Sequence, residues 1–291
     1  MAAQSAVENA GEQGASAGEY IVHHLTHFQN RPMRGVIDFG VYNYDSIFWS
    51  ILLGVIGCFV LWRAAKSATS GVPTRFQGAV EFLVEFVDSQ AKGIVSNAQS
   101  RKLVAPLALA VFVWIFLMNS MDFLPVDLLP GIWSLGNSLV GNDPHHAYLR
   151  VVPTADLSTT LGLSVSVLAV CIYYNIKIKG FGHWVHELFS APFGPKLGPI
   201  NFVFQMIEFT AKTVSHGMRL FGNMYAGELL FMLIALMGSH LALSASGVLL
   251  PLAHILAGTV WSIFHILIVG LQAFVFMMLT LVYIGQAHDA H

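Results

Sequence analysis

Long apolar segments constrain this chain more than any other feature of its sequence. Three of them have the length of one helical crossing of a bilayer, at approximately 46–62, 103–120 and 157–176. A helix rises about 1.5 Å per residue, so roughly 20 apolar residues cross the hydrocarbon layer of about 30 Å. We therefore expect a membrane-spanning helix at each of these positions.

Two further apolar segments, 201–236 and 248–286, are too long for one upright crossing. A helix of about 36 residues is roughly 54 Å long, so it must tilt strongly, lie partly flat or break. No proline interrupts 201–236, which favours tilt over a break. The sequence therefore predicts an all-α integral membrane protein with about five membrane-crossing helices. The last two should form a long, strongly tilted antiparallel hairpin over 198–287.

The composition agrees with a membrane protein and excludes a soluble domain. Of the 291 residues, 55% are hydrophobic and 10% are charged, against roughly 25% charged in a soluble domain. The net charge is -2 and the basic residues are dispersed, so binding to nucleic acid is not expected. Residues 1–44 lack the basic start and short apolar core of a cleaved signal peptide. We expect them to form a periplasmic N-terminal segment ahead of a single membrane domain at 45–291.

The distribution of basic residues predicts how the helices are oriented. Lysines and arginines gather after the first span and in the loop near 177–196, and such loops face the cytoplasm. The loop between the second and third ordinary spans is acidic and should face outward. This orientation puts the amino terminus in the periplasm and the carboxyl terminus in the cytoplasm. The segment 76–95 has acidic residues at helical spacing among apolar ones, which predicts an amphipathic helix at the cytoplasmic interface.

Arg219 is the residue that most needs an explanation at membrane depth. It lies near the centre of 201–236 among apolar side chains. An arginine in the middle of a bilayer costs about 2.5 to 3.5 kcal/mol on insertion, and this cost favours a functional role. The alternative is an arginine that reaches an interface or is held in a structural ion pair.

Arg219 belongs to a polar stripe along one side of its helix. At about 100° per residue, a set of polar side chains falls within about 40° of it. The stripe consists of Gln205, Glu208, Lys212, Ser215, Arg219 and Asn223. Such a stripe indicates a face that lines water or meets a moving partner charge. The alternative is a face buried against another helix and held by interhelical hydrogen bonds.

Glu228 should lie on the opposite face of this helix, since it is about 180° around from Arg219. Polar side chains on the last apolar segment share one face within about 20°. They are His254, His265, Gln272 and Tyr283. In an antiparallel hairpin Glu228 could face His265 or Gln272, which would give a relay of groups that take up and release protons. A lone histidine in a membrane more often fills a packing position, and we keep that interpretation for His254 but not for His265.

Asp122 and Asp127 stand where the second ordinary span meets the outer surface. Carboxylates there would raise the local concentration of protons at the mouth of a pore, and the alternative is a solvated loop that ends a helix. His183 and His186 have a spacing known from metal sites, but they lie on a short predicted loop, so we expect no metal. The sequence has no phosphate-binding loop motif, so it predicts no nucleotide site and no cofactor.

Several short motifs occur in the order of a known family. The longest is RLFGNMYAGE at 219–228, and FHILI at 264–268 and LQAF at 271–274 follow it. RVVP at 150–153 and SGVP at 70–73 belong to the same set. Together they resemble the a subunit of the F-type ATP synthase, the proteobacterial ATPase A chain family of the Fo sector, over most of the chain.

The resemblance implies roles for individual residues. Arg219 matches the essential arginine that faces the ring of c subunits and attracts each ring carboxylate as it passes. The residues that match the outer half-channel are Asp122, Asp127, Asn223, Glu228, His265 and Gln272. Ser215 matches the inner half-channel. Close relatives carry a glutamate where this chain has Gln205, so we expect Glu208, a turn later on the same stripe, to take over that role.

The resemblance also implies a non-catalytic subunit that conducts protons. Two offset half-channels would load and unload protons on the c-ring carboxylates, coupling proton flow to ring rotation and ATP synthesis. The implied partners are the c-subunit ring, the b-subunit peripheral stalk, the rest of the ATP synthase complex, the lipid bilayer of the bacterial inner membrane, and protons. A sodium-coupled version of the same subunit is one alternative. A secondary transporter is another, but it would need broken helices or inverted repeats, which the sequence does not show.

Overall fold

The computed structural model describes most of the chain between residues 18 and 287. The described residues are 18, 21–22, 24–31, 38, 40–69, 71–95, 97–125, 128–141, 148–190, 193–194, 197–239 and 249–287. Within these ranges the regular elements are helices, together with an isolated bridge between Gln29 and Asn43. The predicted all-α class is therefore confirmed.

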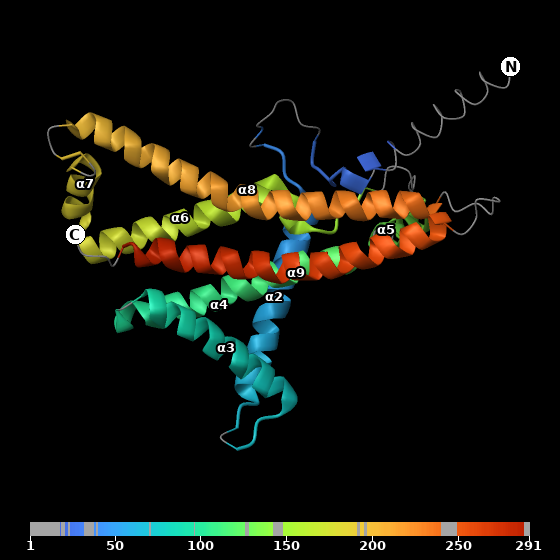
Figure 1. Cartoon of the computed structure of the whole chain (residues 1–291), viewed down its shortest axis with the longest axis horizontal. Coiled ribbons are helices and arrows are strands. Elements are labelled where there is room, and N and C mark those ends of the chain that lie inside the picture. Colours follow the sequence, from blue (N-terminus) through green and yellow to red (C-terminus); the bar gives the residue numbers. More distant parts are fainter. Residues whose placement is uncertain are drawn as a thin grey trace. The chain divides into compact units, whose positions relative to one another are not determined.

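Five of the described helices are long and apolar enough to cross a membrane (Figure 1). They are α2 (Tyr44–Lys66), α4 (Ala98–Ser120), α6 (Leu157–Lys179), α8 (Gly198–Ser239) and α9 (Leu249–Gly285). All the predicted spans are confirmed, and each begins and ends within a few residues of its apolar segment, because the apolar segment itself sets the length of the helix. The chain is a multi-pass membrane protein.

The predicted amphipathic helix is confirmed as α3 (Arg75–Ile94). The side chain of Thr74 caps its start by accepting a hydrogen bond from the backbone N–H of Gln77. Val87 and Ala91 are buried while Glu81 is exposed, as the helical spacing of these residues requires. Its position at the cytoplasmic interface stays a prediction.

Two shorter helices were not predicted. One is α5 (Leu128–Val140), and the other is α7 (Phe181–Ser190), which lies in the segment 177–196 that we expected to be a loop. Gly180 has a φ of 80°, a conformation that glycine adopts without strain, and it separates the end of α6 from the start of α7. The ammonium of Lys179 lies 2.8 Å from a carboxylate oxygen of Glu187, which joins the two helices.

The chain divides into two compact units. Unit 1 contains Met1–Ile51, Met118–Ala155 and Asn223–Val269, and unit 2 contains Leu52–Leu117, Asp156–Gly222 and Gly270–His291. Each of the helices α8 and α9 has one half in unit 1 and the other half in unit 2.

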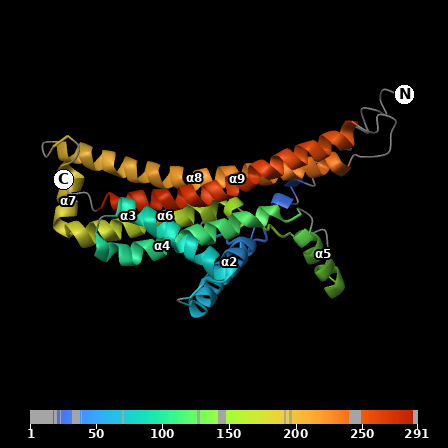
Figure 2. The same cartoon turned by 60° about the horizontal axis from the view of Figure 1, so that its bottom comes forward.

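The halves of α8 and α9 are antiparallel and side by side in unit 1 (Figures 1 and 2), and in unit 2 they are in contact around Lys212 and His216 of α8. In unit 1, Gly227 lies against His265 and Gly238 lies against His254. In unit 2, the ring of His216 lies 3.7 Å from that of Phe276, centroid to centroid. The residue numbers rise along α8 as they fall along α9, so the antiparallel hairpin is confirmed. Its tilt stays a prediction, because tilt is defined against a bilayer.

Candidate functional site

A buried ion pair in unit 1 joins Arg150, which lies before the start of α6, to Glu228 on α8. The Nε atom of Arg150 is 3.2 Å from Oε2 of Glu228, and the two side chains are 5% and 10% exposed. The guanidinium also contacts Nε2 of His27 at 3.0 Å and lies over the ring of Tyr225, 5.5 Å from its centroid. Buried charges are stable only when they are paired, so this arrangement fixes the position of the Glu228 carboxylate.

Asp45, at the start of α2, ties this ion pair to the amino-terminal segment. Its carboxylate accepts hydrogen bonds from the backbone N–H groups of Phe28 and Arg150, both at 3.1 Å. Nδ1 of His27 lies 3.3 Å from the same oxygen. His27 therefore stands between the carboxylate of Asp45 and the guanidinium of Arg150.

A second acid–base pair lies nearby in unit 1. Oδ2 of Asp122, on the short 3-10 helix η1 (Met121–Phe123) that follows α4, is 2.7 Å from Nε2 of His265 on α9. The His265 side chain is fully buried, and the rings of Phe123, Phe231 and Trp261 surround it. The two atoms are in contact, but the ring is not oriented to donate a hydrogen bond along that line, and Nδ1 has no hydrogen-bond partner in the described part of the chain.

A small cavity of about 30 Å³ is lined by one carboxylate from each of these two pairs. Asp122 and Glu228 both line it, together with His24 and apolar side chains. A space above roughly 10–15 Å³ can hold a water molecule, so water can bridge the two carboxylates.

The contacts in unit 1 differ from those that we expected. Glu228 was expected to face His265 or Gln272, but its partner is Arg150, and the partner of His265 is Asp122. Gln272 belongs to unit 2, where it is buried. Arg150 was not predicted to be part of this site, although it begins the RVVP motif. Asp127 lies outside the described residues.

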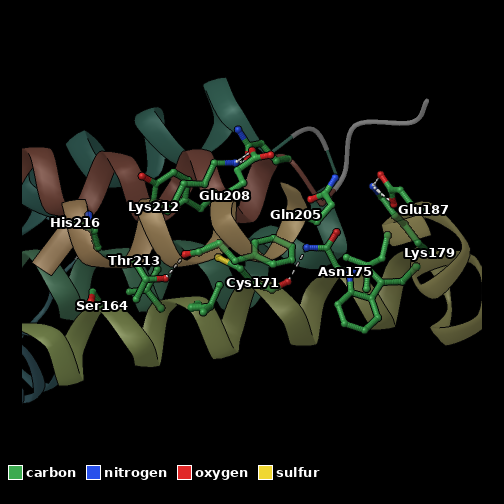
Figure 3. Close-up of a pocket in the computed structure, with 17 residues that line it drawn as sticks. Ser164, Cys171, Asn175, Lys179, Glu187, Gln205, Glu208, Lys212, Thr213 and His216 are labelled. Atoms are coloured by element: carbon green, nitrogen blue, oxygen red, sulfur yellow. Dashed lines mark hydrogen bonds and ion pairs between the residues drawn. The ribbon is translucent and has the colours of Figure 1, made fainter. Parts of the chain in front are cut away.

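Unit 2 contains a larger cavity, of about 380 Å³, between α6, α7, α8 and α9 (Figure 3). Polar side chains from all four helices line it. They are Ser164, Asn175 and Lys179 of α6, Glu187 of α7, Gln205, Glu208, Lys212, Thr213 and His216 of α8, and Tyr283 and Gln286 near the end of α9. This volume holds several water molecules, and the polar lining can bind them.

The charged groups of this cavity are paired with each other. The ammonium of Lys212 is 2.6 Å from Oε1 of Glu208 and 3.1 Å from Oε1 of Gln286. It also lies 5.8 Å from the centroid of the Tyr283 ring. At the other end of the cavity, Lys179 pairs with Glu187, as Figure 3 shows.

The polar stripe of α8 divides into two parts. Gln205, Glu208 and Lys212 line the cavity of unit 2, whereas Ser215 and Arg219 are exposed. Within the described part of unit 2, the Arg219 guanidinium makes neither a hydrogen bond nor an ion pair. A structural ion pair therefore does not explain this arginine within its own unit. Asn223, the last member of the stripe, is half-buried in unit 1.

His183 and His186, whose spacing is known from metal sites, lie on α7. His183 and His186 are both exposed. Among the described residues, no group of three or more histidine, cysteine, aspartate or glutamate side chains could hold a metal ion.

Paired acids and bases inside the helical bundle of an integral membrane protein are typical of proteins that move ions across bilayers. Comparison with known proteins gives the family. The family model described as "ATP synthase A chain" matches residues 47–285. The chain therefore belongs to the ATP synthase A chain family, as its motifs led us to expect.

Curated relatives agree over nearly the whole chain. ATP synthase subunit a of Paracidovorax citrulli (strain AAC00-1) is 64% identical over 284 residues, which cover 95% of this chain and 97% of the relative. The same subunit of Acidovorax sp. (strain JS42) is 64% identical over 290 residues, covering 97% and 99%. That of Psychrobacter cryohalolentis is 46% identical over 298 residues, covering 96% and 98%. The protein is thus a membrane subunit of an F-type ATP synthase, in its Fo sector.

Proposed function

We propose that this chain is the proton-channel stator of its ATP synthase, with two half-channels that load and unload protons on carboxylates of the rotating c-ring. It would be non-catalytic and have no nucleotide site of its own. Its partners would be the c-ring, the b-subunit stalk and the rest of the complex. Residues 1–44 would be periplasmic, ahead of a single membrane domain at 45–291 with its carboxyl terminus in the cytoplasm.

The order of sites along α8 is the observation that carries this proposal. Residues between Gln205 and His216 on one side of α8 line a polar cavity, Arg219 follows on an exposed face, and Glu228 lies in a buried cluster of acids and bases. A single unbroken helix thus carries a side of a polar cavity, an arginine that no carboxylate in the described part of its unit neutralises, and a second polar site. A subunit with two proton routes, separated by a fixed positive charge, would have its two polar sites on either side of an arginine in this way.

The outer route would use the acid–base groups of unit 1. A proton arriving past Asp127 would reach Asp122 and His265 and pass through water to Glu228. Asn223 and Gln272 would supply amide groups on the way to the ring. The Arg150 guanidinium supports this role, because it holds Glu228 in one position and leaves its second face to the cavity.

The inner route would use the cavity of unit 2. Glu208 and Gln205 both line this cavity, so either can order its water, and Glu208 alone of the two can bind and release protons there. Ser215 would extend the polar surface toward Arg219.

Arg219 would act on the ring by electrostatics. A guanidinium close to a ring carboxylate stabilises the ionised form, so a carboxylate that approaches Arg219 releases its proton to the inner route. The same positive charge repels protons that would pass from one route to the other without turning the ring.

Replacing Arg219 tests the proposal. In inverted membrane vesicles, we expect Arg219→Ala to abolish ATP-driven proton pumping while the complex still assembles. Arg75→Ala is the matched control, since Arg75 is an exposed arginine at the start of α3 and should tolerate the change. Pumping at the normal rate in assembled Arg219→Ala complexes would refute the stator role.

A further inference from the structure

His216 is a buried titratable residue that neither proposed route uses. Its side chain is in contact with the rings of Phe276, at 3.7 Å between centroids, and Tyr283, at 5.7 Å. The residue is 2% exposed, yet both ring nitrogens lack a hydrogen-bond partner among the described residues. Buried polar atoms are usually paired, so an unpaired imidazole calls for a reason.

The cavity of unit 2 supplies that reason. His216 lines the cavity at the end away from Lys179 and Glu187 (Figure 3). Water in the cavity is therefore the available partner for its ring nitrogens. On α8, Arg219 is three residues further on, about 60° around the helix and roughly 4.5 Å along it. His216 thus stands between the cavity and the exposed face that carries Arg219.

The other charged groups of the cavity are already engaged. Lys212 on α8 pairs with Glu208 and Gln286, and Lys179 on α6 pairs with Glu187 on α7. The remaining titratable groups that face the cavity are the thiol of Cys171 and the phenol of Tyr283, from α6 and α9. Of the three groups that are not in an ion pair, only the imidazole of His216 has separate atoms that accept and donate a proton.

We propose that His216 is the proton-relay residue of the inner route. A neutral imidazole has one nitrogen that accepts a proton and one that donates. A proton released by a ring carboxylate at Arg219 would bind to the accepting nitrogen, and the proton on the other nitrogen would leave to cavity water. One proton enters and one leaves, which leaves the ring as the other tautomer, and a turn of the ring that exchanges the positions of its two nitrogens restores the starting state. This inference rests on the proposed stator function and extends it.

The test uses whole ATP synthase in liposomes, with ATP synthesis driven by a potassium diffusion potential in the presence of valinomycin. His216→Leu keeps a side chain of similar size but cannot bind protons, and His216→Gln keeps polarity without exchanging protons. We expect both to lower the rate at least about tenfold, because a positioned proton-transfer group typically accelerates a reaction by about 10² to 10⁴. His183→Ala, at an exposed histidine on α7 that does not line the cavity, should have the normal rate.

Rescue by free imidazole separates a relay from a structural role. We expect His216→Ala to be slow as well and to recover when imidazole is added on the side of the catalytic head, because imidazole can enter the cavity and carry the proton. The electrical driving force is chosen because a weak base does not collapse it, and rates are compared with the normal complex in the same imidazole. A slow His216→Ala complex that imidazole does not accelerate would overturn the relay.

Arg219→Ala in the same assay distinguishes the two proposals. If Arg219→Ala is inactive and either His216→Leu or His216→Gln has the normal rate, the relay is wrong and the stator role stands. If Arg219→Ala has the normal rate, the stator role is wrong, and the relay that rests on it falls too.

Discussion

At the scale of single residues, the pairing of Glu228 with Arg150 has the clearest energetic consequence. Both side chains are buried, so removing one of them leaves the other as an unpaired charge inside the protein. Breaking a buried ion pair in this way costs about 3–5 kcal/mol, whereas replacing both partners by neutral groups costs much less. The pair therefore constrains which substitutions the two positions can tolerate.

We predict that Arg150→Leu destabilises the subunit by about 3–5 kcal/mol and that adding Glu228→Gln recovers most of this loss. Thermal unfolding of the purified complex in detergent, analysed as a double-mutant cycle, measures the coupling. The control is Arg31→Leu, because Arg31 pairs with Asp38 at 3.0 Å but is 46% exposed, and a surface pair contributes about 0–1 kcal/mol. If Arg150→Leu lowered the stability equally with Glu228 and with Gln at position 228, the result would contradict the ion pair.

Residue pairing was the least predictable part of the site. Polar residues of the two long helices could be recognised individually, because a charge in an apolar segment stands out. Their partners could not, because Arg150 and Glu228 are 78 positions apart. Such a contact depends on how separate helices and loops pack, and helical spacing carries information only within one helix.

At the scale of elements, the lack of a side chain at Gly227 allows α8 to approach α9 closely in unit 1. A Cβ atom added at Gly227 would overlap the imidazole of His265 and come within 3.2 Å of Oδ2 of Asp122. The absence of a side chain at Gly227 therefore leaves the space in which the Asp122–His265 pair forms.

We predict that Gly227→Ala displaces the His265 ring from Asp122 and lowers proton flux without preventing insertion into the membrane. Passive proton conductance of vesicles stripped of the catalytic head measures this. Gly258→Ala is the control within the same hairpin, because a Cβ there meets its nearest neighbour, Ile234, at an ordinary 3.7 Å. A conductance in Gly227→Ala equal to that of Gly258→Ala would show that the outer route does not need this pair.

Elements were predictable where one signal dominated. The five long helices follow directly from apolar segments that are long enough for a bilayer. Helix α5 was missed because Pro130, Gly131 and Gly136 are typical of loops, although proline is tolerated in the first turn. Helix α7 was missed because it has only 10 residues, too few for a periodic pattern to be distinguished from a polar loop.

At the scale of the whole molecule, the identity of the transported ion is the property that follows least directly from this chain. Ring subunits would supply most of the ligands that select the ion. This subunit contributes histidines in both units, His265 in unit 1 and His216 in unit 2, and imidazole exchanges protons.

We predict that ATP synthesis by the reconstituted complex proceeds at the same rate with and without sodium. A protonophore should abolish it, and a sodium-selective ionophore should not. A requirement for sodium at neutral pH would contradict proton coupling and favour the sodium-coupled version of the subunit.

The buried charges of unit 1 do not cancel. The described part of this unit has three buried carboxylates, those of Asp45, Asp122 and Glu228, and one buried guanidinium, that of Arg150, which pairs with Glu228. Protonation of both His27 and His265 would bring the total to neutrality, since these imidazoles contact the carboxylates of Asp45 and Asp122. With these carboxylates ionised and the histidines neutral, the interior of this unit would carry a net negative charge, which favours the approach of a proton over that of chloride or hydroxide.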